Sequence, residues 1–332
     1  MTHLGLDIAS GENPLEELLH GVIEALGRNK DVKISVVGDE KRISDFLKTK
    51  SYDKNRLFIV HSSDTILMTD DPLTVCRRKP RSSLMVGLQA LKYDKIDCFF
   101  SPGNTGATLA GSLLTVGRIP GIKRPAIACP LPTDLNKKVA LFLDGGANVD
   151  CTALYLKQFA QMGSIYYQNA FNVENPRVAL LNVGEEKGKG NQVTKQAFEK
   201  IKQTSLNFIG NIEPKEFFEH RADVAVCDGF IGNIFLKTAE STVAQINGIL
   251  SHGIRQTLLG RIAGYMMLKT FRRIKREMNA SNFGAAPLLG LAKPVFIGHG
   301  KTDKQSIINS VPGAVKFVQS GCIEMIKKEI IS

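Results

Sequence analysis

The chain contains 332 residues, 43% of them hydrophobic, and its 43 Lys and Arg residues outnumber its 32 Asp and Glu residues to give a net charge of +11. This composition supports a large core, and the positive excess favours an anionic partner, although it also serves solubility. No run of about 18 apolar residues is present, and the six cysteines show no CxxC spacing, which argues against a membrane-spanning helix, a zinc site and a disulfide framework. The N-terminal residues lack the pattern of a signal peptide, so we expect a cytosolic protein.

Short apolar runs rich in β-branched residues alternate with longer amphipathic segments along the chain. The short runs predict strands at Val32–Val37, Leu57–Val60, Cys98–Ser101, Ala126–Cys129, Val139–Leu143, Val178–Val183, Val224–Cys227 and Val295–Ile297. The longer segments predict helices at Leu15–Leu26, Thr105–Val116, Leu154–Tyr167, Gln192–Lys202 and Ser306–Ile330. This alternation is typical of crossover connections, so we expect a three-layer α/β/α fold with a mostly parallel sheet. No repeat or linker is visible, and we treat residues 1–332 as a single domain.

Polar, glycine-rich segments follow five of the predicted strands. They are Ser101–Gly106, Asp144–Asp150, Asn182–Asn191, Asp228–Asn233 and Gly298–Asp303. In parallel sheets, loop amides and helix N-termini converge at this edge and bind ligands. Each segment alone also fits an ordinary turn. Together the five predict one polar cleft for an anion.

The Ser101–Gly106 segment is the strongest of the five. Gly103 and Gly106 flank Asn104 and Thr105 at the start of an apolar helix, an arrangement that binds phosphate through backbone amides. The segment matches neither of the common nucleotide-binding patterns, GxxxxGK[ST] and GxGxxG. The alternative is a helix start capped near Thr105.

Basic and acidic side chains accompany these segments. Lys189, between glycines before a helix, can neutralise phosphate, or it is simply solvated. His299, also between glycines, can hold phosphate, protonate a leaving thiolate or cap a turn. Asp7, Asp150 and Asp228 follow strands, where carboxylates orient a cation or cap the next helix. They show no metal-ligand spacing, and we expect neither a metal nor another cofactor.

Residues 249–278 combine apolar stripes with basic side chains. The first stripe is Leu250, Ile254, Leu258 and Ile262, and the second, after Gly260 and Gly264, is Met267, Phe271, Ile274 and Met278. Seven basic residues accompany a single acidic one. We expect two amphipathic helices with a glycine break, forming a projecting hairpin for a membrane surface, a dimer interface or an acidic protein. The alternative is a helix that packs on the core and has a solvated basic face.

Blocks of residues over nearly the whole chain resemble one known family. They are Val37–Glu40, Asp70–Pro72, Arg77–Lys79, Gly103–Ala107, Gly117–Gly121, Arg124–Ala126, Gly145–Cys151, Gln158–Ser164, Leu181–Glu186, Lys189–Asn191, Asn207–Asn211, Cys227–Asn233 and Gly284–Gly290. The sequence is similar in these blocks to the PlsX family, the acyl-[acyl-carrier-protein]:phosphate acyltransferases of bacterial phospholipid synthesis. It departs from the family near the N-terminus, where Ser10 and Glu12 replace a Gly and an Asp.

The resemblance implies a fold like that of isocitrate and isopropylmalate dehydrogenases and of phosphotransacetylases. It implies a homodimer in the cytoplasm, peripherally associated with the inner face of the membrane through residues 249–278. The implied partners are acyl carrier protein, inorganic phosphate and a membrane glycerol-3-phosphate acyltransferase that receives the acyl phosphate, with no nucleic acid.

We expect bound phosphate to attack the thioester directly, because phosphate is a competent nucleophile at neutral pH and needs no Ser or Cys intermediate. The groups assigned to catalysis are Lys189, His299, Asn233 and Asp228. Those assigned to binding phosphate or substrate are Gly103, Asn104, Thr105, Gly106, Asn148, Asp150 and Asn191. Those assigned to the hairpin surface are Leu258, Ile262, Met267, Phe271, Arg272 and Ile274.

Other classes of function stay open at this point. An NAD-dependent decarboxylating dehydrogenase on a similar fold needs a paired-Asp metal site and an adenosine pocket, and neither is visible. A noncatalytic membrane scaffold needs only the hairpin and leaves the strand-end segments without a role. Nucleic-acid binding is weakly supported, because the chain has no Trp and the basic excess is concentrated in residues 249–278.

Overall fold

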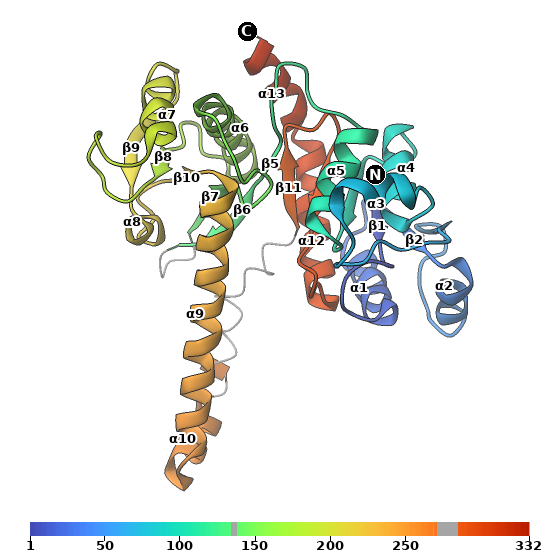
Figure 1. The fold of residues 1–332 in the computed structure, drawn as a ribbon. Helices are drawn as coiled ribbons and strands as arrows, with labels where there is room; N and C mark the ends of the chain where they lie inside the picture. The colour runs from blue at the N-terminus through green and yellow to red at the C-terminus, as the bar shows by residue number, and fades with distance from the viewer. Residues whose placement is uncertain (134–137, 268, 271–284, 332) are drawn as a thin grey trace.

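The computed structural model describes residues 1–133, 138–267, 269–270 and 285–331, which form two sheets with helices around them (Figure 1). The first sheet has seven strands in the order β3-β2-β1-β4-β12-β11-β5. In chain order these are β1 (Thr2–Asp7), β2 (Val32–Gly38), β3 (Leu57–His61), β4 (Cys98–Ser101), β5 (Ala126–Ile127), β11 (Ala286–Leu289) and β12 (Val295–Ile297). The strands from β3 to β12 are parallel, and β11 is antiparallel to both of its neighbours.

Helices cover both faces of this sheet because its buried strands alternate in the direction of their side chains. Cys98 and Phe100 of β4 join the hydrophobic cluster beneath α1 and α12, whereas Phe99 joins a second cluster beneath α4 and α5. The helices associated with this sheet are α1 (Leu15–Arg28), α2 (Glu40–Leu47), α3 (Pro72–Arg78), α4 (Ser83–Lys92), α5 (Thr105–Thr115) and α12 (Lys304–Gln319).

The second sheet has five strands in the order β6-β7-β10-β8-β9, parallel except for β6. They are β6 (Cys129–Pro132), β7 (Val139–Leu143), β8 (Val178–Leu181), β9 (Phe208–Ile212) and β10 (Val224–Val226). The remaining helices are α6 (Ala153–Phe171), α7 (Gln192–Lys202), α8 (Pro214–Phe218), α9 (Gly229–Arg255), α10 (Leu258–Met266) and α13 (Cys322–Ile331). One hydrophobic cluster contains residues of both sheets, including Leu6 and Leu143. That residues 1–332 form a single domain stays a prediction.

The predicted α/β class is confirmed, but the structure corrects three details. There are two sheets where one was expected. The run predicted as a strand at Ala126–Cys129 is divided between β5 and β6, so that the chain passes here from the first sheet to the second. The helix predicted at Ser306–Ile330 is interrupted at Gly321, whose φ of +65° is one that glycine adopts without strain.

Helix α9 projects far beyond both sheets (Figure 1). It has 27 residues and is therefore about 40 Å long. Only Gly229 and Gly232, in its first turn, are fully buried. Most of its remaining length lacks the packing that usually stabilises a helix. We call α9 and α10 together the arm.

The end of the arm differs from the hairpin predicted for residues 249–278. The helices separate between Arg255 and Leu258, and Gly260 and Gly264 lie inside α10 instead of forming the break. Helix α10 packs back against α9, and a Cβ at Gly264 would lie 2.5 Å from Ile254 Cγ2. The glycine thus permits close contact between the two helices. Phe271, Arg272 and Ile274 lie outside the described residues, as does the second predicted stripe beyond Met267.

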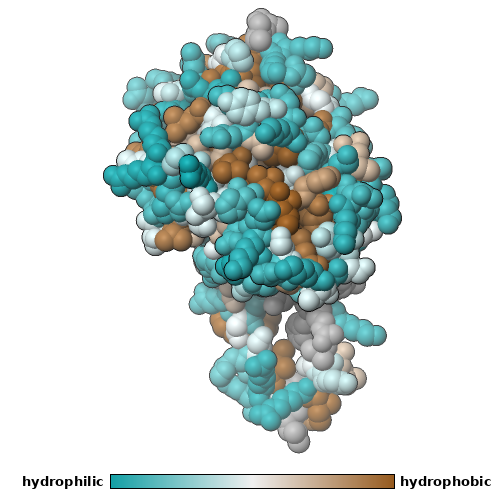
Figure 2. Space-filling model, turned by 90° about the vertical axis from the view of Figure 1, so that its right-hand side faces the viewer, coloured by the Kyte–Doolittle hydropathy of each residue, from teal (hydrophilic) through white to brown (hydrophobic). Residues whose placement is uncertain are grey.

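Apolar side chains on the arm are exposed together with polar ones (Figure 2). The exposed apolar residues are Phe230, Ile231, Ile234, Ile246, Ile249, Leu250, Leu259, Ile262, Tyr265, Met266 and Met267. The alternative of a helix that packs on the core is therefore wrong for the described part of the segment. Among the described residues, no helix is long and apolar enough to cross a membrane.

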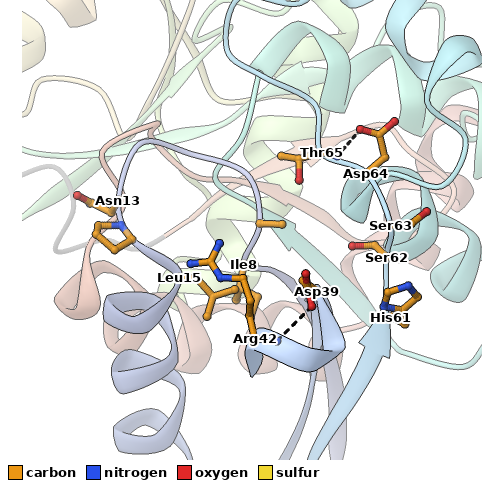
Figure 3. A pocket seen from close by; sticks show the side chains of 12 residues that line it. Ile8, Asn13, Leu15, Asp39, Arg42, His61, Ser62, Ser63, Asp64 and Thr65 are labelled. Atoms are coloured by element: carbon orange, nitrogen blue, oxygen red, sulfur yellow. Dashed lines mark hydrogen bonds between the residues drawn. The ribbon is translucent and has the colours of Figure 1, made fainter. Parts of the chain in front are cut away.

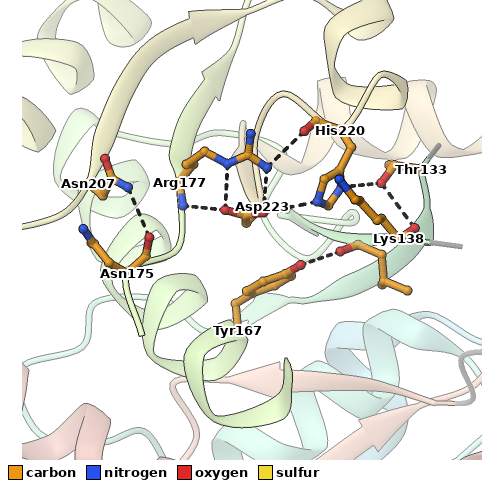
Figure 4. A network of polar contacts seen from close by, with 9 residues as sticks. Thr133, Lys138, Tyr167, Asn175, Arg177, Asn207, His220 and Asp223 are labelled. Carbon is orange, nitrogen blue, oxygen red and sulfur yellow. Dashed lines mark hydrogen bonds and ion pairs between the residues drawn. The ribbon is translucent and has the colours of Figure 1, made fainter. Parts of the chain in front are cut away.

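A polar network closes the end of the second sheet where β8 and β10 begin (Figure 4). Arg177 donates to Asp223 Oδ2 from its backbone N (2.7 Å) and Nε (3.0 Å), and to Oδ1 from Nη2 (2.9 Å). His220 Nε2 lies 3.3 Å from Asp223 Oδ1, and its Nδ1 lies 2.7 Å from Thr133 Oγ1. Burial raises the pKa of Asp223, but the bonds from Arg177 outweigh it, and the net pKa is lowered.

We expect Asp223→Asn to lower the free energy of unfolding by about 2 kcal/mol at neutral pH, because it removes the shared carboxylate of the buried His220 and the partly exposed Arg177. A lowered folded-state pKa means that the carboxylate stabilises the fold above its ordinary pKa, and that this stabilisation is lost as the pH falls through the folded-state value. Urea unfolding at pH 7 and pH 3 should therefore show the difference between wild type and variant shrinking in acid. Asp45→Asn, at an exposed pair with Lys48, should leave the midpoint unchanged at both values. A constant difference across this range would contradict the assignment.

Candidate functional site

Three loops meet at the carboxyl ends of β1, β4 and β12, which are neighbours in the first sheet. We call residues 8–13, 101–106 and 298–303 the first loop group. Glu12 N donates to Gly300 O (2.8 Å), and Asn13 Nδ2 donates to Thr302 O (2.7 Å). A Cβ at Gly103 would lie 2.7 Å from Ser10 Cβ. The structure thus brings His299 and the Gly103–Gly106 segment into one cluster.

The side chain of Asp7 connects two loops of the first loop group. Its carboxylate is fully buried and accepts hydrogen bonds from Ala9 N and Ser10 N (both 3.1 Å) and from Ser101 Oγ (2.9 Å). Burial raises the pKa of Asp7, and bonds from Ser83, Ser10 and Ser101 oppose that rise. Asp7 is the link between the loops after β1 and β4, so its role is to orient the loops.

The beginning of α5 presents backbone amides, whereas the Asn104 side chain is used within the protein. Asn104 Oδ1 caps the helix by accepting from Ala107 N (3.0 Å). Its Nδ2 donates to Met68 O and Asp70 O (both 3.1 Å) and so fixes the loop before α3. The helix cap was the alternative considered from sequence, and the structure shows it at Asn104 instead of Thr105. This cap uses Ala107 N, whereas Thr105 N and Gly106 N have no acceptor among the described residues and remain available to an anion.

His299 is exposed, and one of its ring nitrogens has a defined role. Lys301 N donates to His299 Nδ1 (3.2 Å). In the neutral ring the proton is therefore on Nε2, which can donate to a ligand. The loop that carries His299 adjoins the loop before α5, because Gly298 N donates to Ser101 O (2.9 Å).

An open hollow of about 550 Å³ lies beside the first loop group, at the ends of β1, β2 and β3 (Figure 3). Ser62 and Arg42 line it together with two carboxylates, Asp39 and Asp64. Arg42 pairs with Glu16 at 3.2 Å, and Asp39 accepts from Arg42 N at 3.1 Å. This mixed lining suits polar groups of a ligand better than a hydrocarbon chain.

A second loop group, residues 144–150 and 228–233, follows β7 and β10. Asp144 is fully buried and accepts from Ile127 N (2.9 Å), Ala147 N (3.1 Å) and Asn148 N (2.8 Å). Burial raises the pKa of this carboxyl, and the N–H donors oppose the rise. Because Ile127 belongs to β5, Asp144 ties the loop after β7 to the edge of the first sheet.

The site residues predicted in the second loop group differ in whether their polar groups are already hydrogen-bonded within the protein. Asn148 is buried, and its Nδ2 donates to Pro125 O (2.7 Å) and Asp144 Oδ2 (2.8 Å), so both amide hydrogens are used. Asp228 caps α9 by accepting from Ile231 N (2.8 Å). Asn233 and Asp150 are exposed. A direct contact of any of these four with substrate stays a prediction.

Lys189 lies in the loop after β8, residues 182–191, which we call the lysine loop. Asn182 Nδ2 donates to Lys189 O (3.2 Å), and Asn211 Nδ2 donates to Glu186 O (3.0 Å), so the backbone on either side of the lysine is held. Lys189 is exposed and has no ion pair within the described part of the chain. Asn191 caps α7 by accepting from Thr194 N (2.9 Å). The described hydrogen bonds and ion pairs join this loop to β9, to Glu199 of α7 and to Arg221, and none of them reaches either loop group.

The loops predicted to form one cleft are therefore distributed over two sheets. Both loop groups nevertheless border the same hydrophobic cluster, which contains Ala107 of α5 and Ile297 of β12 and against which Ala147 packs. The loops carry free amides, an imidazole N–H and an exposed ammonium on a backbone that is held in place, and these are groups that bind an oxyanion.

Comparison with known proteins gives the family. The family described as fatty acid synthesis protein matches residues 2–325. The phosphate acyltransferase of Brachyspira hyodysenteriae is 42% identical over 330 residues, which are 99% of this chain and 97% of that protein. The chain belongs to this family. The match confirms the resemblance seen in the sequence and the prediction of a phosphate acyltransferase of lipid synthesis.

Solved structures of other proteins have a similar fold. A phosphotransacetylase from Streptococcus pyogenes superposes with a TM-score of 0.60 at 14% identity, covering 97% of this chain and 94% of that one. A 4-hydroxythreonine-4-phosphate dehydrogenase from Klebsiella pneumoniae gives 0.52 at 12% identity, covering 96% and 98%. At these identities the likeness concerns the fold alone, and it confirms the predicted fold class.

Sequence reasoning missed several residues that build the site in this member of the family. Asp144, Ser101, Asn182 and Asn211 hold the loops but were not assigned a role. The signal available for Asp144 was its position directly after a buried strand and before two glycines. Asn211 carried no comparable signal, because it contacts Glu186 from a different strand.

Proposed function

We propose that this enzyme transfers the acyl group of an acyl carrier protein thioester to inorganic phosphate, which gives acyl phosphate and free carrier thiol. The observation that carries the proposal is the contact between the loop that begins α5 and the loop that contains His299, at neighbouring strand ends. Free first-turn amides and an imidazole N–H form a cradle for phosphate there. The acyl group as the second reactant is inferred from the phosphate acyltransferases to which the chain is similar.

In the reaction, a phosphate oxygen forms a bond to the thioester carbonyl carbon, and the C–S bond breaks with its electron pair on sulfur. The Gly103–Gly106 amides and His299 Nε2–H orient the phosphate and reduce its charge repulsion with the incoming carbonyl. The thiolate takes up, through solvent, the proton that the hydrogen phosphate ion carried into the reaction. No covalent enzyme intermediate is required.

Lys189 supplies a positive charge. Its backbone is pinned by Asn182 and Asn211, so the ammonium is carried on a loop of fixed shape. It balances the charge of phosphate or of the oxyanion that develops on the carbonyl oxygen. Asn233 and Asn148 are the amide side chains of the second loop group. Asn148 contributes by holding the shape of the loop, because its amide bonds Pro125 O and Asp144 Oδ2.

The test is incubation of the protein with palmitoyl-acyl carrier protein and labelled phosphate. We expect label in an acid-stable, hydroxylamine-sensitive acyl phosphate, at the same rate as free carrier thiol appears. Release of thiol without labelled acyl phosphate would show a thioesterase instead. Absence of both products would overturn the proposal.

We further propose that the arm attaches the enzyme peripherally to the membrane or to its homodimer partner, near the acyltransferase that consumes the product. The observation is the set of exposed apolar side chains on α9 and α10 (Figure 2). Exposed apolar surface of this extent marks an interaction site, and amphipathic helices bind the boundary of a bilayer.

Replacing exposed apolar residues of the arm should weaken this attachment. We expect Ile249→Glu with Ile262→Glu to reduce binding to anionic vesicles about tenfold or more, because both apolar burial and charge attraction are lost. Sedimentation with vesicles measures the effect. Gln245→Glu with Ser251→Glu adds the same charge at exposed polar positions of α9 and should reduce binding much less. An equal loss of vesicle binding in both double variants would show that the added charge explains the effect and that the apolar side chains do not contribute.

A further inference from the structure

A second, open cavity of about 380 Å³ has a basic lining and includes no residue of either loop group. Its walls come from α5 (Leu113), from the first turn of α6 (Tyr155) and from the loop between α5 and β5, which supplies Arg118, Lys123 and Arg124. We call residues 117–125 the basic loop. The cavity has a function still to be assigned, because the mechanism above uses none of these side chains.

The basic loop is held rigidly. Ile119 and Ile122 anchor it in the core. Gln158 of α6 clamps it from both sides by donating from Nε2 to Gly121 O (2.9 Å) and accepting at Oε1 from Lys123 N (2.9 Å). Arg118 donates from Nη1 to Lys123 O. A loop fixed in this way presents its cations without a large loss of entropy on binding.

The cations of the basic loop have no anionic partner among the described residues. Among the described residues, Arg118, Lys123 and Arg124 make no salt bridge, whereas Arg177 and Lys79 do. The beginning of α6 adds the partial positive charge of a 19-residue helix, and Tyr155 adds a hydroxyl. Three unpaired cations around one cavity favour a phosphate ester, for which guanidinium groups have matching geometry.

The cavity is also connected to the second loop group. Arg124 precedes Pro125, whose carbonyl accepts from Asn148 Nδ2 (2.7 Å), and Asn148 is bonded to Asp144 (2.8 Å). Tyr155 follows the same loop, two residues into α6. The cavity and the second loop group are thus joined by direct hydrogen bonds.

We propose that this cavity binds the phosphate of the phosphopantetheine arm that carries the acyl thioester. The inference rests on the proposed function and deepens it by separating two phosphate sites. One, at α5, holds the inorganic phosphate that reacts. The other, at the basic loop, holds the phosphodiester that positions the thioester.

The test compares two ligands that differ only in this phosphate, 4′-phosphopantetheine and pantetheine. Binding is measured by calorimetry on the full-length protein without inorganic phosphate, so that the result is independent of turnover. We expect phosphopantetheine to bind about tenfold more tightly, the value of one charge-assisted hydrogen bond. Lys123→Gln and Arg124→Gln should each remove most of this difference. Lys54→Gln, which removes one charge from an exposed position before the opposite edge strand β3, should keep it.

Three results would overturn the inference. One is equal affinity of the wild type for the two ligands. Another is a preference that survives in both variants and disappears with saturating inorganic phosphate, which would place the ester at α5. The third is an equal loss of affinity in the variants for carrier protein with and without its arm, which would make the basic loop a contact for the acidic carrier surface. Failure to form acyl phosphate in the labelling assay, with the binding preference intact, would count against the proposed function only.

Discussion

Gly103→Ala should lower kcat/KM for phosphate by about 100-fold, because the new Cβ would displace the amides that bind phosphate. The ideal Cβ position lies 2.7 Å from Ser10 Cβ, and both atoms belong to loops that are fixed by Asp7. The loops must move apart by several tenths of an ångström or more. A displacement of this size at a binding loop misaligns every donor on it.

The structure also predicts how to reverse this effect. Ser10→Gly removes the atom that the new methyl group would meet, and the next contacts, at Ser101 Oγ and beyond, are 3.3 Å away or more. We therefore expect Ser10→Gly with Gly103→Ala to recover most of the activity. Gly27→Ala, where nothing lies within 4 Å of the added Cβ, is the control for the substitution itself. Steady-state kinetics with phosphate as the varied substrate measure all four proteins. A double variant as inactive as Gly103→Ala would exclude the steric explanation.

The strand and helix pattern was predictable where apolar runs are continuous. Seven of the eight apolar runs located a single strand within a few residues, and the eighth, Ala126–Cys129, covers parts of two strands. These runs are recognisable because strands buried on both faces are apolar throughout. β1, β9 and β11 were missed since they contain Gly5, Gly210 and Pro287, which interrupt such a run. Gly5 is nevertheless required, because a Cβ there would lie 2.3 Å from Ile96 Cδ1. Local periodicity also does not report that a strand changes sheets, as the chain does between Ile127 and Cys129.

The candidate site was predictable as a set of loops but not as a set of free side chains. Asn104 and Asn148 were assigned to ligand binding, yet their amide groups are used by carbonyls of Met68, Asp70 and Pro125. Those acceptors lie more than 20 residues away in sequence, and only the folded structure reveals them. The glycines at 103 and 106 were more predictable, since a glycine before a helix needs only a local explanation.

For charged groups too, the sequence does not reveal which side chains are already paired within the protein, as Lys187 and Lys189 show. Both lysines stand beside glycines in the lysine loop, and sequence alone favoured Lys189 only by its position before a helix. The structure distinguishes them. Lys187 Nζ lies 2.7 Å from Glu199 Oε1 and packs over the ring of Phe198, whereas Lys189 has no ion pair in the described residues.

We therefore expect Lys189→Met to lower kcat/KM for phosphate by about 100-fold, and Lys187→Met to change it by less than about threefold. The two substitutions remove the same charge from the same loop, two residues apart, so a general field effect would affect both alike. Lys189→Arg keeps the charge and should retain a larger share of the activity than Lys189→Met. Kinetics at two salt concentrations separate a specific contact from screening, because the loss in Lys189→Met should persist at high salt. If Lys187→Met proves as damaging as Lys189→Met, the loop acts through its total charge, and the assignment of Lys189 to the reacting phosphate fails.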